Sequence, residues 1–190
     1  MHTHTYAHTS VPACATCCRL SFLAGHPAAG DEPLPNAIAA AALALAHAKT
    51  APERTALALR CFALRQVTYA LGGTGGTARS FVVGIGPNPP AQPRHAQASC
   101  AGPPGSPCDA MVALSAPGPN PHVARGALVA GPERDDSYND DRRTPGARVS
   151  VAYNVQLMAA LAGLLQTALP RQECLQGRGL FQATFYSDLL

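Results

Sequence analysis

The chain has 190 residues, of which 13% are charged and 47% apolar, and its formal net charge is +3 at pH 7. This length fits one domain or part of a larger one. The apolar share excludes disorder over the whole length, because disorder requires low hydrophobicity and high net charge. Lys49 is the only lysine, so the dense basic patch of a nucleic-acid-binding protein is missing. The longest apolar run, residues 37–46, is too short to span a bilayer. We expect neither nucleic acid nor membrane as a partner.

Residues 1–35 are expected to form an irregular leader, because four prolines interrupt them and no apolar periodicity is present. They do not resemble a secretory signal, since no clear apolar segment follows a charged start. Cys14, Cys17 and Cys18, with four nearby histidines, form a metal-like cluster. A zinc site needs a second Cys or His pair at the usual spacing, and the sequence has none. We therefore expect no metal site, and a metal-binding leader is kept only as a third hypothesis.

Two helices are predicted after the leader. Asn36 is a suitable N-cap for a helix that ends near Lys49. Pro52 can open a second helix, which Gly72 stops. The short link between the two helices predicts an antiparallel hairpin. Apolar residues at spacings of three and four give the second helix one apolar stripe: Leu57, Cys61, Leu64, Val67 and Leu71.

Residues 74–145 are rich in Pro and Gly and predict long loops, with one short extended piece at 80–83. A third helix is predicted over residues 149–169, ended by Pro170. The tail, residues 170–190, has no clear pattern. The leucines expected on one face of the third helix are Leu157, Leu161, Leu164 and Leu165.

Three segments carry a more specific residue order: residues 80–95, 119–142 and 152–164. Taken in this order, they resemble the C-terminal part of the family 9 glycoside hydrolases, which are endoglucanases (cellulases). The resemblance covers about residues 36–165. It implies an all-α fold, the closing helices of an (α/α)6 barrel with long Pro/Gly-rich loops. Residues 36–169 would then be a partial catalytic domain.

The resemblance implies hydrolysis of internal β-1,4-glucosidic bonds, with inversion, in cellulose-like glucans. Inversion requires an acid and a base carboxyl group about 6.5–9.5 Å apart. The family's base is an Asp in an N-terminal motif, and no such motif precedes Asn36. We therefore expect the base to be absent from this chain.

The family's acid is a Glu six residues before an Asn that follows a Tyr. Counting back from Asn154 gives Arg148, which cannot donate a proton. Counting forward from Asp140 gives Val149, since one residue is missing nearby. Neither residue is a carboxylic acid, so the resemblance predicts that the acid is also missing.

Four residues of this chain are nevertheless candidate site residues through the resemblance. Asp140 matches the family's motif Asp and has either a catalytic role or a loop-capping role. Arg94 stands where the family has a sugar-contacting His, and His95 lies one position later. Asn154 matches the family's Asn. We expect Arg94, His95 and Asn154 to contact substrate.

Seven cysteines leave at least one without an intrachain partner. Cys100 and Cys108 flank a Pro/Gly-rich loop, so they form either a loop-closing disulfide in an exported protein or two free thiols. The resemblance implies an extracellular protein with a β-1,4-glucan as its ligand, and no cofactor is expected.

Two functional hypotheses follow. In the first, the chain is a truncated or degenerate endo-β-1,4-glucanase-like protein without activity. In the second, it is a non-catalytic remnant that binds glucan weakly or packs against a partner.

Overall fold

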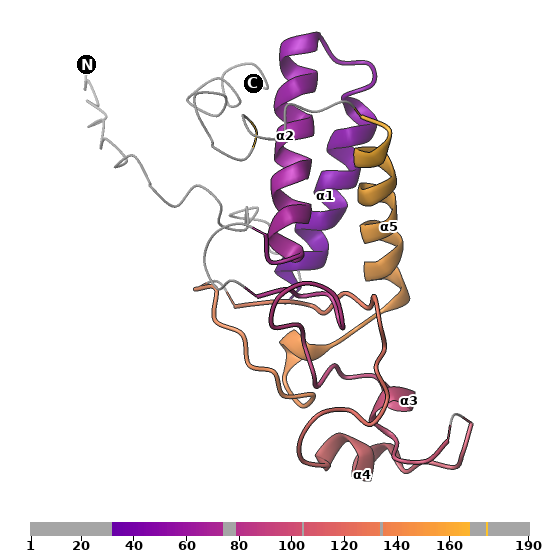
Figure 1. Cartoon of the computed structure of the whole chain (residues 1–190). Coiled ribbons are helices and arrows are strands. Elements are labelled where there is room, and N and C mark those ends of the chain that lie inside the picture. Colours follow the sequence, from indigo (N-terminus) through magenta and orange to yellow (C-terminus); the bar gives the residue numbers. More distant parts are fainter. Residues whose placement is uncertain (1–31, 74–78, 104, 134, 168–173, 175–190) are drawn as a thin grey trace, which may run out of the picture.

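The computed structural model describes residues 32–73, 79–103, 105–133, 135–167 and 174. Three long helices, α1 (Pro33–His47), α2 (Glu53–Ala70) and α5 (Val151–Leu165), stand side by side above a layer of loops (Figure 1). These described residues contain no β-strand, only isolated β-bridges. The predicted all-α class is confirmed for this part of the chain.

Several predicted features lie outside the described residues. They are the leader up to residue 31 with its Cys/His cluster, residues 74–76 of the glycine-rich stop, and the tail except for Cys174. The predictions for these segments stay predictions.

The predicted hairpin of α1 and α2 is confirmed, but α1 begins at Pro33 and not after Asn36. Residues 33–35, expected in the leader, therefore belong to the helix. Pro is tolerated in the first turn because its missing N–H would have no helical partner there. Leu34 is completely buried against Gly131, where any side chain would collide with it. This packing explains the earlier start.

Helix α5 begins two residues later and ends four residues earlier than predicted. Ser150 caps its start by accepting a hydrogen bond from the Ala152 N–H. At its end, the Thr167 hydroxyl donates to the Gly163 carbonyl at 2.7 Å, which satisfies an acceptor of the last turn. Gly163 also lies against Leu45 of α1, so α1 and α5 approach closely there.

The predicted apolar faces are confirmed only in part. In α5, Leu157 is buried and Leu161 and Leu164 are partly buried against the core, whereas Leu165 is 84% exposed. Leu165 therefore does not share the burial of the other three leucines. In α2 the buried face is made largely of small residues and includes Cys61 and Val67.

The loop layer contains four extended segments that lie side by side. Val82 pairs with Leu128, Val129 pairs with Val149, and Arg94 pairs with Arg148. The order is therefore 81–83, 127–130, 147–149 and then Arg94. These pairings bring together the first two segments that carry the family resemblance and residues 147–149, which lie just before the third.

Short helices interrupt the region that was expected to be only loop. They are α3 (Ala96–Ser99), α4 (Ala110–Ser115) and a 3-10 turn, Pro145–Ala147. Asp109 caps α4 by accepting from the Met111 and Val112 N–H groups.

Two disulfides stabilise the described residues. Cys100–Cys108 closes the Pro/Gly-rich loop, so the disulfide alternative is confirmed over the free thiols. Cys61–Cys174 was not foreseen and joins α2 to the tail across 113 residues of sequence. The Arg65 Nε also donates to the Cys174 carbonyl at 2.6 Å. One point of the tail is thus fixed to the helices.

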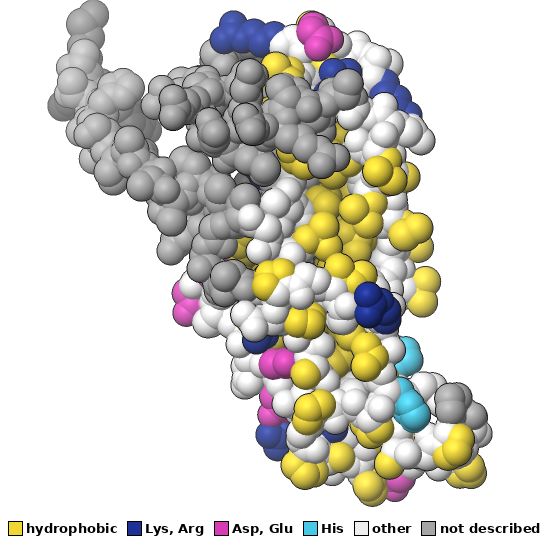
Figure 2. Space-filling view, viewed as in Figure 1, with side chains coloured by type: hydrophobic (Ala, Val, Ile, Leu, Met, Phe, Trp, Pro, Cys, Tyr) yellow, Lys and Arg dark blue, Asp and Glu magenta, His cyan; other side chains and the backbone are white. Residues whose placement is uncertain are grey.

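An apolar strip runs along the outer face of α5, a helix that contains no charged residue. Its members are 62–84% exposed: Val151, Val155, Met158 and Leu165. Figure 2 shows hydrophobic side chains gathered along the exposed helical face. In the described part of the chain, no helix is both long and apolar enough to cross a membrane.

Removal of the long-range disulfide by Cys61→Ser with Cys174→Ser should lower the free energy of unfolding by about 5 kcal/mol. The reason is the long chain segment that the bond closes in the unfolded state. Cys100→Ser with Cys108→Ser is the matched control. It closes only eight residues and should cost about 2.5 kcal/mol. Urea unfolding of both variants measures the difference, and equal losses would contradict this role of the tail.

The α5 strip should drive self-association of the isolated chain, because burying exposed apolar area is favourable. Val155→Lys with Met158→Glu should reduce this association without unfolding the protein, since both side chains face solvent. His47→Lys with Thr50→Glu adds the same charges elsewhere and should leave association unchanged. Light scattering coupled to size exclusion measures the mass. A monomeric unmodified chain with a sharp thermal transition would contradict the prediction.

Candidate functional site

The turn at residues 91–95 is held from two neighbouring loops. The Asp140 carboxylate accepts from the backbone N–H groups of Ala91 at 2.8 Å and Gln92 at 3.1 Å. The Asn120 side-chain amide donates to the Pro93 carbonyl at 2.8 Å. Asp140, a candidate catalytic residue, thus makes the contacts of a loop-holding carboxylate in this structure.

Arg94 and Arg148 are brought side by side although they are far apart in sequence. The Arg94 N–H donates to the Ala147 carbonyl at 2.7 Å, within a parallel bridge between Arg94 and Arg148. Residues paired in this way point to the same face, with backbones about 4.8 Å apart. Two positions that the family resemblance singled out, Arg94 and Arg148, therefore meet, and both carry guanidinium groups.

The two arginines differ in their partners. Arg148 forms an ion pair with Glu32, at 2.9 Å between Nη1 and Oε1. The Arg94 side chain is exposed and makes no hydrogen bond or ion pair with another described residue. The carboxylate that the structure places against Arg148 is thus held in an ion pair.

Tyr153, in the first turn of α5, completes the contacts around Arg148. Burial raises the pKa of its hydroxyl to about 12, with a further increase from its hydrogen bond to Glu32. Tyr153, Glu32 and Arg148 therefore form one polar cluster where α1 and α5 begin. Neither Glu32 nor Tyr153 was identified as a site residue from the sequence. Glu32 comes from a segment with no local signal, 116 residues before Arg148.

His95 and Asn154 are both engaged with backbone groups. The His95 Nδ1 accepts from the Ala98 N–H at 3.2 Å and caps α3. Because Nδ1 is the acceptor, Nε2 carries the proton of the neutral ring. The Asn154 Oδ1 accepts from the Leu128 N–H at 2.8 Å and joins α5 to the extended segments. Their expected contact with substrate stays a prediction.

Asp141 and Tyr138, which lie near Asp140 in the sequence, have shifted pKa values. A hydrogen-bonded ion pair with Arg143 lowers the pKa of the Asp141 carboxyl to about 2. Burial, and after it the nearby Asp140 charge, raises the pKa of the Tyr138 hydroxyl. Asp141 lies at the surface beside its own arginine. Among the residues with described positions, no group of three or more His, Cys, Asp or Glu could hold a metal ion.

Comparison with known proteins identifies the family. The sequence model of "Glycosyl hydrolase family 9" matches residues 15–161. Endoglucanase 18 of Oryza sativa subsp. japonica is 37% identical over 107 residues, which are 56% of this chain and 20% of that protein. Endoglucanase B of Cellulomonas fimi is 39% identical over 107 residues, which are 55% of this chain and 9% of that protein. The chain therefore spans about a fifth or less of these two relatives.

Solved structures are similar over most of the chain. The endoglucanase of the termite Nasutitermes takasagoensis has a TM-score of 0.61 and 40% identity, over 70% of this chain and 30% of that one. Endoglucanase CelQ of Clostridium thermocellum, complexed with cellotriose, has a TM-score of 0.59 and 32% identity, over 77% of this chain and 22% of that one. The helices and loop layer are thus part of an (α/α)6 barrel, and the chain belongs to glycosyl hydrolase family 9.

Proposed function

We propose that this protein is an inactive endo-β-1,4-glucanase-like member of family 9 that binds β-1,4-glucan on its loop face without hydrolysing it. One observation carries the proposal. The two positions to which the family resemblance assigns the acid hold Arg148 and Val149, and the Arg148 guanidinium is ion-paired with Glu32. A guanidinium cannot donate a proton to a leaving sugar oxygen at any working pH.

The ligand class is carried over from the relatives. Proteins similar to this chain are named endoglucanases, and CelQ was crystallised with cellotriose and with cellotetraose. The loop layer of this chain, with the turn at 91–95 and the segment at 147–149, is the part that the resemblance associates with sugar contacts. We therefore carry over to this chain only the binding of β-1,4-glucan. The inverting hydrolysis that the resemblance implies for a whole family member is not part of the proposal.

An extracellular location is part of the proposal. Two disulfides in the described residues, Cys61–Cys174 and Cys100–Cys108, fit an oxidising compartment. Family resemblance points the same way.

A second candidate function is packing against a partner protein. The exposed strip on α5 favours it, because four large apolar side chains face solvent on a helix without charge. This candidate predicts no affinity for glucan, so cellulose binding separates the two.

The purified chain should release no reducing sugar from soluble carboxymethylcellulose above a vector-only preparation. It should nevertheless co-sediment with amorphous cellulose. The termite endoglucanase, assayed in parallel, is the positive control for hydrolysis. Hydrolysis that co-purifies with the chain would refute the inactive state, and failure to sediment with cellulose would refute glucan binding.

A further inference from the structure

The loop face carries two guanidinium groups where a neutral sugar would need none. Arg94 and Arg148 are paired in a parallel bridge, so their side chains leave adjacent backbones on the same face. The Arg148 side chain is 49% exposed even with its Glu32 partner in place. Arg94 is exposed and makes no hydrogen bond or ion pair with any residue that the structure describes.

Two cations carried on adjacent backbones raise the positive potential of this face, and an anion bound there lowers the electrostatic energy. The guanidinium group suits carboxylates in particular, because its planar donors match the two carboxylate oxygens. The protein itself shows this chemistry on the same face, since the Glu32 carboxylate lies 2.9 Å from Arg148. With one carboxylate for two guanidiniums, the cluster of Arg94, Arg148 and Glu32 has a net charge of +1.

The backbone below the two arginines is fixed before any ligand binds. Asp140 and Asn120 hold the turn that carries Arg94. The Arg148 carbonyl accepts from the Ala130 N–H at 2.8 Å, which joins it to the next extended segment. On binding, conformational entropy is therefore lost by the arginine side chains and not by the backbone that carries them.

We propose that the Arg94–Arg148 face binds the carboxylate of a uronate-bearing β-1,4-glycan, and that Glu32 competes with this ligand for Arg148. The inference rests on the proposed function for its β-1,4-linked sugar backbone and adds the acidic substituent. It assigns a chemical class of ligand to two of the positions at which this chain departs from the family pattern.

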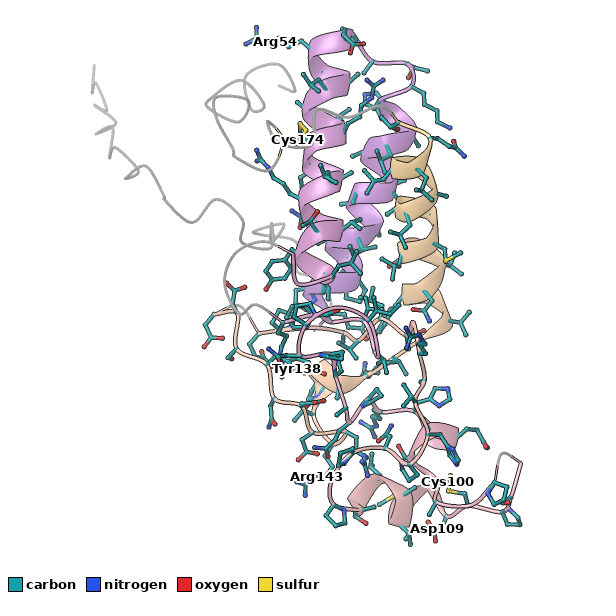
Figure 3. The ribbon with its side chains drawn as sticks, in the orientation of Figure 1. Arg54, Cys100, Asp109, Tyr138, Arg143 and Cys174 are labelled. Carbon is teal, nitrogen blue, oxygen red and sulfur yellow. A yellow bond between two sulfur atoms is a disulfide. The ribbon has the colours of Figure 1, made fainter. Side chains whose placement is uncertain are left out.

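The first test compares two probes on the full chain by calorimetry, at low and at physiological salt. The probes are cellohexaose and the β-1,4-linked glucuronate hexamer. Arg94→Gln should weaken binding of the acidic hexamer about tenfold, through loss of charge-assisted hydrogen bonds. Its effect on cellohexaose, which has no carboxylate, should be several-fold smaller than its effect on the acidic hexamer. Arg54→Gln is the matched control, since Arg54 lies at the opposite end of the helices from the loop layer (Figure 3).

The second test removes the charge of Glu32, which competes with the ligand for Arg148. Glu32→Gln frees Arg148 from its carboxylate and should strengthen binding of the acidic hexamer about three- to tenfold, with the gain decreasing as salt rises. Gln keeps the size of the side chain and can still hydrogen-bond Tyr153. Glu53→Gln removes the same charge from the start of α2 and should leave the affinity unchanged. A nonspecific effect of net charge would instead be equal in the two variants.

The outcomes separate this inference from the proposed function. Binding of cellohexaose without preference for the acidic hexamer overturns the inference and leaves glucan binding in place. Equal effects of Arg94→Gln and Arg54→Gln overturn it as well. Binding of the acidic hexamer alone supports the inference and refutes the neutral glucan as ligand. Binding of neither probe overturns both.

Discussion

Every second residue of segment 138–142, that is Tyr138, Asp140 and Arg142, holds a different part of the loop layer in place. Tyr138 packs edge-on against Phe81, with ring centroids 5.5 Å apart. Asp140 accepts two backbone N–H groups of the turn before Arg94. Arg142 is 1% exposed and donates to three carbonyls at the end of α4 and in the turn after it. The layer has no long element of its own, so its shape depends on these contacts.

The same segment determines where the candidate site residues lie. Asp140 acts on the turn that presents Arg94, and the pairing of Arg94 with Arg148 follows from that turn. A buried arginine is costly unless its donors find acceptors, and three carbonyls accept from the two Nη groups of Arg142, while its Nε has no hydrogen-bond partner among the described residues. The chain therefore has a defined backbone at the candidate site. At Arg94 and Arg148 its side chains differ from those that the family resemblance implies.

Much of the helical part could be predicted from local patterns. Apolar spacing identified α2, and the glycines after it identified its end. The predicted start of α1 was four residues too late, because tertiary packing of Leu34 outweighed the capping preference of Asn36. The exposure of Leu165 could not be foreseen either, since an apolar pattern does not show which neighbours are present.

The site was less predictable because its contacts join distant parts of the chain. Residue order alone identified Arg94 and Arg148 as positions of interest, but not their pairing. The Glu32–Arg148 ion pair and the Cys61–Cys174 disulfide span 116 and 113 residues, and no local signal marks such pairs. Arg142 lies inside a recognised motif, yet only the structure shows that its charge is buried.

Backbone NMR mapping on the full ¹⁵N-labelled chain tests most directly whether the loop face is the glycan-binding surface. On titration with cellohexaose, shift changes should cluster in residues 91–95, 119–123 and 147–149, with little change in residues 53–60 at the far end of α2. Changes confined to residues 151–165 would instead indicate that the apolar strip of α5 is the surface in use. Absence of any change at saturating cellohexaose would contradict glucan binding altogether.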